Sequence, residues 1–337
     1  MFQRARKKSI ISFQEDAVRH ILVERRGKKL FLLQHRSMVL PPIFSKSEKR
    51  QQEKILHRIL KEMFQKTSNI SLPRKITVML PQALFKVFIP KTHPFPKNPS
   101  RKKIRKFLEE QFSQQRKFLS LYGFEYSFEK RKGGAPRLRF RFLLQETHRW
   151  YEKILKKFSL HIEAFQPSLH ILSEYIFRET QEGNFLHLHI GETSSFLFQN
   201  KNGEIFMEKK FAFSYQGIRS FIEKNEKRKE IFLQEGFYET EENTRLLQEL
   251  QKYFHPLAQY LMESSLSLPF YVTSSQRIPK GLLAKIQRVY AGEVYPFCVF
   301  DSLQKKMDGV LQLHKEEDKM FSPLLAEASM ALIDDER

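Results

Sequence analysis

Cysteine is almost missing from this chain of 337 residues, since Cys298 is the only one. A single thiol excludes an intramolecular disulfide and a cysteine-based zinc site, and it suits a reducing compartment. Only 12 glycines and 15 prolines are present, which excludes collagen-like and low-complexity architectures. The 32 phenylalanines and the 41% share of hydrophobic residues exclude a disordered chain and supply a sizeable core.

Long hydrophobic runs are missing as well. No stretch approaches the ~20 consecutive apolar residues of a membrane-spanning helix. The short run Ser9–Phe13 near the start is too brief for the core of a signal peptide. We therefore expect a cytoplasmic protein that contacts a membrane only peripherally.

Acidic residues are scarce in the first half of the chain. Residues 1–150 carry 36 Lys and Arg against 11 Asp and Glu, a net charge of +25, whereas residues 151–337 carry 23 against 27, a net charge of −4. Such a one-sided charge attracts polyanions, which include nucleic acid, an anionic lipid surface and an acidic protein segment. Charge alone does not choose among these partners.

Hydrophobic periodicity predicts a mixed α/β order with several hairpins, which disfavours a pure array of βαβ units. Prolines at 90, 94, 96 and 99 predict a stiff, extended connector, because proline fixes φ and removes a backbone donor. The predicted strands cover 9–13, 17–24, 29–34, 75–80, 85–89, 122–130, 137–144, 160–165, 185–190, 194–199, 204–213, 269–273 and 294–300. The predicted helices cover 47–64, 101–119, 147–158, 167–177, 215–224, 243–264, 281–290 and 323–333.

A basic segment stands out between residues 101 and 150, which carry 14 basic and 5 acidic side chains. A helix capped by Ser100 opens it, and a strand follows in which arginines alternate with Leu138, Phe140 and Phe142. Because strand side chains alternate between faces, the arginines should line one face. We predict partner or membrane contact through Arg101, Lys102, Lys103, Arg105, Lys106, Arg137, Arg139 and Arg141.

Other reactive side chains form no catalytic or metal-binding set. His187 and His189 lie two apart on a strand and could form half of a metal site, but no carboxylate or cysteine stands at ligand spacing, so we predict no metal. The serines at 194, 195, 274 and 275 lack the G-x-S-x-G pattern of a hydrolase. Glu15, Asp16 and Glu192 have no nucleophile to pair with, which favours solvated charge. Cys298 lies in an apolar stretch, where we expect a core strand.

The order of elements resembles the actin-like ATPase superfamily, in particular the PilM-like pilus assembly proteins and the cytoplasmic domain of GspL from type II secretion. The strand and proline ITVMLP at 76–81 are similar to the start of that family's inserted subdomain. The segment HLHIGETSSFLFQNKNGEIFMEKKFAF at 187–213 resembles its second phosphate hairpin, and FYVTSSQRIPKGLLAKI at 270–286 resembles its adenosine-side loop. The resemblance implies two ribonuclease-H-like lobes with a small inserted α+β subdomain: lobe 1 over 1–74, 145–184 and 321–337, the basic insert over 75–144, and lobe 2 over 185–320.

The three loops that would hold a nucleotide depart from the family's pattern. The early Asp-Ile-Gly loop of nucleotide-binding members falls here on residues 12–14, followed by two carboxylates that would repel a triphosphate. In the second loop a glycine remains, but a histidine stands at the Asp position, and two serines replace the paired glycines of the third loop. Glycine lets backbone N–H groups wrap a phosphate, so its loss disfavours ATP and Mg²⁺, and we expect no cofactor. The vestigial positions are Ser12, Gln14, His189, Gly191, Thr193, Ser274 and Ser275.

The same resemblance implies a function as a non-catalytic scaffold, a pseudo-ATPase of a bacterial type II secretion or type IV pilus inner-membrane assembly platform. Such a scaffold rests against the anionic inner-membrane surface and binds a membrane-anchored assembly subunit, the secretion ATPase, or both. In the family the insert and its neighbouring lobe form the docking groove, so contact is expected near 75–142. Two alternatives stay open: a basic nucleic-acid-binding protein, which no helix-turn-helix, RNP-like or zinc signature supports, and an active actin-like ATPase.

Overall fold

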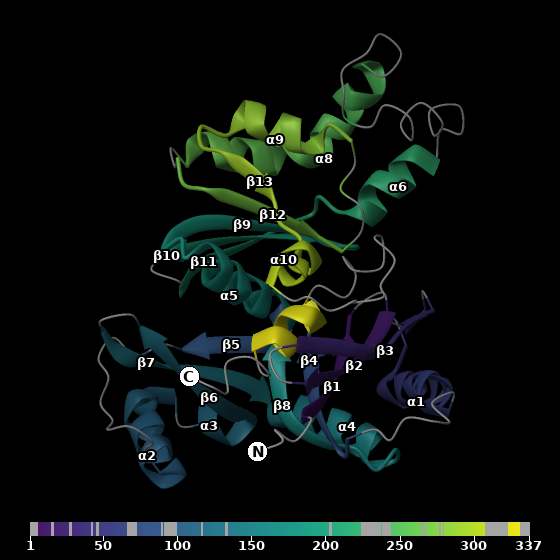
Figure 1. Cartoon of the computed structure of the whole chain (residues 1–337), viewed down its shortest axis with the longest axis vertical. Helices are drawn as coiled ribbons and strands as arrows, with labels where there is room; N and C mark the ends of the chain where they lie inside the picture. Colours follow the sequence, from purple (N-terminus) through teal and green to yellow (C-terminus); the bar gives the residue numbers. More distant parts are fainter. Residues whose placement is uncertain are drawn as a thin grey trace.

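The computed structural model arranges the chain as two lobes with a smaller subdomain beside the first lobe (Figure 1). The predictions for Glu15, Asp16 and the prolines at 94, 96 and 99 lie outside the residues that it describes. The described residues are 6–14, 17–26, 29–41, 43–44, 47–65, 73–88, 90, 100–115, 117–131, 134–201, 204–223, 237, 244–264, 267–275, 278, 280–306 and 323–330.

Lobe 1 is built on a five-stranded sheet with the order β3-β2-β1-β4-β8. The first three strands form antiparallel pairs, and β4 and β8 add in parallel. The helices α1 (Lys49–Gln65) and α4 (Gln145–Lys156) pack on the sheet through residues such as Leu60 and Ile154, which are buried with Ile11 and Val78. The strands are β1 (Arg6–Phe13), β2 (Ala17–Arg26), β3 (Lys29–Val39), β4 (Lys75–Leu80) and β8 (His161–Pro167).

Lobe 2 repeats this topology, because its sheet has the order β11-β10-β9-β12-β13. A second antiparallel meander is again followed by two parallel strands. The helices α6 (Tyr215–Glu223), α8 (Thr244–Glu263) and α9 (Leu282–Val289) bury their apolar sides against this sheet. The strands are β9 (Asn184–Ile190), β10 (Ser195–Lys201), β11 (Glu204–Phe211), β12 (Phe270–Ser274) and β13 (Val294–Pro296).

Helices pack between the two lobes. The helices α5 (Ser168–Thr180) and α10 (Val299–Lys306) and the helix at 323–330 lie between the two large sheets (Figure 1). One buried cluster joins Ile10 of lobe 1, Phe198 of lobe 2 and Leu172, Leu303 and Leu325 from these helices. The lobes are therefore held together by a continuous apolar core.

The insert is a three-stranded antiparallel sheet, with the order β5-β7-β6, covered by a helix. In that helix, α2, Ile104 and Leu108 are fully buried against Phe140 and Phe142. The Ser100 side chain accepts a hydrogen bond from the Lys103 amide at 3.4 Å, which confirms the predicted cap. The elements are η2 (Gln82–Leu84), β5 (Phe85–Phe88), α2 (Arg101–Gln111), η3 (Ser113–Gln115), α3 (Phe118–Leu121), β6 (Tyr122–Arg131) and β7 (Gly134–Leu144).

Three local expectations are corrected. The strand at 75–80 belongs to the sheet of lobe 1, so the insert begins after it and not at residue 75. The predicted helix 101–119 is interrupted after Gln111, because the rings of Phe112 and Phe118 stack at 4.7 Å and both pack on Phe142.

The third correction concerns the apolar run at 294–300, which is not one strand. Its strand, β13, ends at Pro296, and α10 begins at Val299. Cys298 lies in the connection between them, partly buried against the cluster between the lobes.

Candidate functional site

The predicted first and second loops are closed by their own hydrogen bonds. In the turn after β1, the Gln14 side-chain amide donates to Ser12 Oγ at 2.7 Å, and the Gln14 backbone N–H donates to the Ala17 carbonyl at 2.9 Å. In the turn after β9, the Gly191 N–H donates to the Ser194 carbonyl at 3.2 Å. A Cβ on Gly191 would lie 2.5 Å from that carbonyl oxygen, so the turn requires glycine. Thr193 is exposed at its tip.

The third loop joins the second. The Ser275 N–H donates to the Ile190 carbonyl at 3.0 Å, and the Ser275 hydroxyl donates to the same oxygen at 3.3 Å. Ser274 is buried with a 6% exposed side chain. The structure therefore brings the loops after β9 and β12 together, as their predicted roles require.

The two predicted histidines meet a threonine that sequence reasoning missed. Thr273 Oγ1 lies 2.8 Å from His187 Nε2 and 3.0 Å from His189 Nδ1, and His187 Nδ1 lies 2.6 Å from Ser173 Oγ. Burial, with a smaller contribution from Arg19, lowers the pKa of His189 to about 4. Burial also lowers the pKa of His187 well below its usual range. Both rings are therefore neutral near pH 7 and belong to an internal hydrogen-bond network.

These residues do not fit a magnesium-bound triphosphate. Mg²⁺ is held through oxygen ligands, usually a carboxylate and the phosphates themselves. The two positions aligned with the family's aspartates hold Ser12, which is fully buried, and His189, which is 7% exposed. Their polar atoms are engaged by Gln14 and Thr273, and Glu192 pairs with Arg219 at 3.5 Å. The described residues also contain no group of three potential metal ligands.

The arginines of β7 lie inside the protein. Arg139 and Arg141 are 3% and 7% exposed, and their guanidinium groups lie 3.7 and 3.9 Å from the Glu174 carboxylate on α5. The opposite face of β7 packs on α2, so both faces of this strand are covered. Arg139 and Arg141 are therefore too buried for the membrane half of the predicted partner or membrane contact, whereas their contact with a partner stays a prediction, and the side chain of Arg137 is outside the described structure.

The basic residues of α2 are exposed, in contrast. Arg101, Lys102, Lys103 and Lys106 are exposed, and so is Arg105, which pairs with Glu109 at 3.0 Å. The described helices include none that is long and apolar enough to cross a bilayer. These five exposed residues give the surface of α2 a positive charge.

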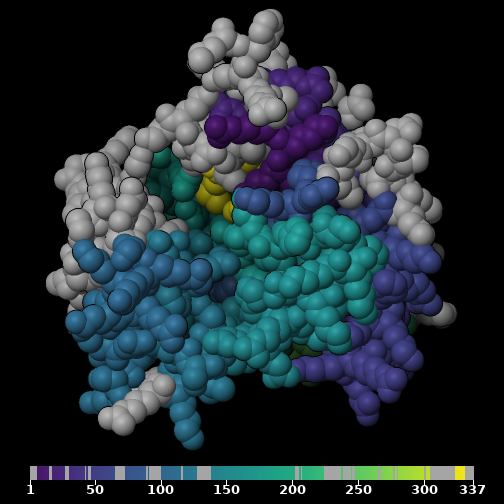
Figure 2. All heavy atoms as spheres, turned by 90° about the horizontal axis from the view of Figure 1, so that it is seen from below, coloured from purple at the N-terminus to yellow at the C-terminus, as the bar shows by residue number. Residues whose placement is uncertain are grey.

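A groove of about 570 Å³ separates the insert from lobe 1, and we call it the β6–β8 groove. Its walls are two strands that lie at the edges of their sheets, β6 of the insert and β8 of lobe 1. Figure 2 shows the surface hollowed between the insert and the adjoining part of lobe 1. Glu125 on β6 accepts a hydrogen bond from the Phe165 N–H on β8 at 2.9 Å, and burial raises the pKa of this carboxyl. The groove thus offers backbone edges, charge and apolar surface together.

No protein-family model matches the chain, and no curated protein matches it in sequence. Solved structures do match in fold. The PilM–PilN type IV pilus biogenesis complex gives a TM-score of 0.68 at 14% identity, covering 95% of this chain and 96% of that chain. The ethanolamine utilization protein EutJ from Carboxydothermus hydrogenoformans gives a TM-score of 0.51 at 9% identity, covering 95% of this chain and 88% of that chain.

The cytoplasmic domain of EpsL, an inner membrane component of the type II secretion system of Vibrio cholerae, gives a TM-score of 0.44 at 9% identity, covering 89% of this chain and 94% of that chain. Three observations agree with the resemblance seen in the sequence. The two lobes have the same strand order, helices pack between them, and the likeness to PilM extends over nearly the whole chain. The chain has the actin-like ATPase fold, with PilM among its structural neighbours.

Proposed function

We propose that this chain is a non-catalytic scaffold of a type IV pilus or type II secretion assembly platform, and that it binds the cytoplasmic segment of a membrane subunit in the β6–β8 groove. The observation that carries the proposal is this groove, which lies between the insert and lobe 1 and has a volume of about 570 Å³. The fold likeness to PilM, solved as a PilM–PilN complex, supports the same class of role.

The groove suits an extended segment. An exposed sheet edge presents backbone donors and acceptors that pair with an added strand, while neighbouring pockets select alternate side chains. Here β6 and β8 supply two such edges, and Phe124, Leu143 and Phe165 supply apolar surface. Arg101 and Arg141 also line the groove and favour an acidic group on the bound segment.

Nucleotide binding and hydrolysis are not part of this proposal. The hydroxyl of Ser12 and the imidazole of His189 take the two positions at which family members carry the aspartates that position Mg²⁺. The apolar core between the two lobes holds the lobes together without a ligand. Partner binding, and not hydrolysis, would then set the angle between the lobes.

Site-specific crosslinking in the host cell tests the docking proposal. A photoreactive phenylalanine analogue at Ala164, on the β8 wall of the groove, is expected to crosslink to the cytoplasmic segment of a membrane protein. Ala164→Arg fills the groove, so the crosslinked membrane protein should no longer co-purify when the variant chain is isolated by affinity purification. The same analogue at Tyr253, which is 43% exposed on lobe 2, is the control position. Equal capture of membrane proteins from both positions would contradict docking in the groove.

The exposed lysines of α2 are proposed to hold the scaffold against an anionic lipid surface. Each lysine close to such a surface contributes about 1 kcal/mol, so Lys102→Glu/Lys103→Glu/Lys106→Glu should weaken binding to phosphatidylserine-containing vesicles about 100-fold or more. Vesicle flotation at physiological salt measures this.

The matched control for the vesicle test is Arg50→Glu/Lys54→Glu/Lys61→Glu, which changes three exposed residues of α1 and alters the net charge equally. We expect less than a threefold effect from it, because the interaction is local and screened beyond about 10 Å. Equal losses in the two triple variants would show that only overall charge matters. Tight binding of duplex DNA at the same salt would favour the nucleic-acid alternative.

A further inference from the structure

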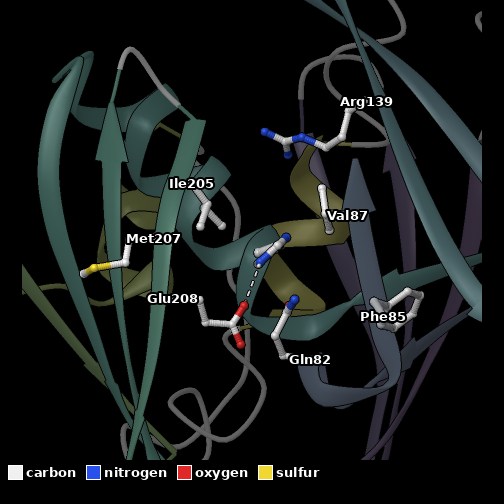
Figure 3. Close-up of a pocket in the computed structure, with 8 residues that line it drawn as sticks. Gln82, Phe85, Val87, Arg139, Ile205, Met207 and Glu208 are labelled. Atoms are coloured by element: carbon white, nitrogen blue, oxygen red, sulfur yellow. Dashed lines mark ion pairs between the residues drawn. The ribbon is translucent and has the colours of Figure 1, made fainter. Parts of the chain in front are cut away.

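A second cavity, of about 360 Å³, lies on the other side of the insert, between the insert and lobe 2, and we call it the β5–β11 pocket. Figure 3 shows Val87 and Phe85 on one side of it and Ile205 and Met207 on the other. Neither the nucleotide loops nor the β6–β8 groove uses this space, so its chemistry has to be explained separately.

Both walls of the pocket are strands at the ends of their sheets. In the described structure β5 pairs only with β7, and β11 pairs only with β10, so each has one free backbone edge. Val87 and Phe85 are two residues apart on β5, which is the repeat of side chains along one face of a strand. On β11 the pairing register with β10 shifts beside Ile205, and Met207 Sδ accepts a hydrogen bond from Tyr260 on α8, so Ile205 supplies the apolar side chain of that wall. The apolar walls therefore match the alternate side chains of an added strand.

Two residues that line the pocket carry buried polar atoms without a hydrogen-bond partner in the described structure. Gln82 is 4% exposed, and its Oε1 makes no hydrogen bond within the described chain. His170 is 5% exposed, and neither ring nitrogen makes a hydrogen bond within the described chain, although Nε2 lies 3.5 Å from a Glu208 carboxylate oxygen. Burial lowers the pKa of His170, so the ring is neutral near pH 7 and carries one N–H donor and one acceptor nitrogen. An unsatisfied buried acceptor costs about 1–3 kcal/mol, so Gln82 Oε1 and the acceptor nitrogen of His170 favour a ligand that donates.

The remaining polar groups narrow the choice of ligand. Arg139 lines the pocket and donates, whereas Glu208 accepts. A small anion would pair with the guanidinium of Arg139 but would donate no hydrogen bond to Gln82 or His170. A polypeptide backbone in extended form carries N–H and C=O groups in alternation, and it supplies both kinds of partner along one line.

We propose that the β5–β11 pocket binds an extended peptide segment of a partner protein, which adds as a strand to the free edge of β11 and lays apolar side chains between Val87 and Ile205. The segment's backbone N–H groups donate to Gln82 and His170, and a carbonyl accepts from Arg139. The bound strand ties the insert to lobe 2. This site shares Phe85 with the β6–β8 groove but does not depend on that groove being occupied.

Peptide selection on the intact chain tests the proposal. A displayed library of random 12-residue peptides is selected against the full-length protein, and the affinities of the synthetic peptides are measured by fluorescence anisotropy. Ile205→Arg and Val87→Arg fill the pocket from opposite walls, and each should weaken one class of selected peptides more than tenfold. Ala164→Arg, in the β6–β8 groove, should change the same affinities less than twofold. Thermal unfolding and circular dichroism establish that each variant is folded, and two independent wall substitutions guard against one of them failing to fold.

The backbone contribution is tested on the same peptides. Gln82→Met keeps the side-chain length and removes the acceptor, so binding should weaken about fivefold. Methylation of alternate backbone nitrogens of the peptide should abolish binding. The proposal is overturned if the selection yields no peptide, if every selected peptide tolerates both wall substitutions, or if the methylated peptides bind as well as the parents. Peptides sensitive only to Ala164→Arg would overturn this proposal and leave the proposed function intact.

Discussion

Acidification from pH 7.5 to pH 5.0 is expected to lower the free energy of unfolding by about 4 kcal/mol through His20 and His189, and further through His187 and His170, whose pKa values burial also lowers. Burial, with a smaller contribution from Arg36, lowers the pKa of His20 to about 3, and the pKa of His189 is lowered to about 4. Below pH 6.5 the unfolded chain binds protons at these rings while the folded chain does not. Their contribution to stability is therefore complete above that pH, and about 2 kcal/mol per ring is lost by pH 5.0.

Urea unfolding at pH 7.5, 6.5 and 5.0 measures this loss. His20→Gln should remove about 2 kcal/mol of the pH dependence, whereas His255→Gln, at an exposed position on α8, should leave it unchanged. Burial raises the pKa of Glu125 and of Glu327, so these carboxyls take up protons in the folded state and offset part of the loss. Stability that is constant or rises from pH 7.5 to pH 5.0 would contradict the description of the histidines as neutral and buried.

Glu174→Gln is expected to lower the free energy of unfolding by about 3–5 kcal/mol at pH 7. The Glu174 carboxylate lies 3.7 Å from Arg139 and 3.9 Å from Arg141 of the insert, and it also pairs with Arg178 at 2.8 Å. Burial raises its pKa, but the three arginines outweigh burial and the net direction is downward. Removal of its charge leaves buried guanidinium groups without this carboxylate, which is costly in a region of low polarizability.

The insert offers a matched control for that substitution. Arg105 and Glu109 form a pair with the same i,i+4 spacing as Glu174 and Arg178, but on the exposed surface of α2. Glu109→Gln should cost less than about 1 kcal/mol, because exposed pairs gain little over hydration. Chemical denaturation of both variants gives the comparison. Similar losses in the two would show that the buried carboxylate does not attach the insert to α5.

Much of the fold could be predicted because local periodicity and turn residues decide it. The strand 75–80 has the predicted bounds, and the cap at Ser100 is confirmed. The apolar run at 294–300 was assigned wrongly, since a short apolar run has no period that separates a strand from a helix. The alternation in β7 predicted two faces correctly. It held no information on α5, which carries the Glu174 carboxylate near Arg139 and Arg141, and so it did not predict their burial.

The candidate site was predictable only where its residues share one element. His187 and His189 were expected on one face from their spacing, and the structure places both beside Thr273. Thr273 was missed because its contact depends on the parallel register of β12 with β9, in which His189 stands opposite Thr273. The family resemblance implied a docking groove between the insert and its neighbouring lobe, but the strands that form the β6–β8 groove, and the whole of the β5–β11 pocket, were missed for a related reason. Each lies between separate sheets, and their relative placement has no signal in local sequence.

The central claim is that this chain keeps the actin-like fold but binds a partner segment and not a nucleotide. Titration calorimetry with Mg-ATP tests this claim most directly. The buried hydroxyl of Ser12 and the imidazole of His189 predict no saturable binding at nucleotide concentrations up to about 1 mM. Stoichiometric Mg-ATP binding with a dissociation constant in the micromolar range would contradict the account.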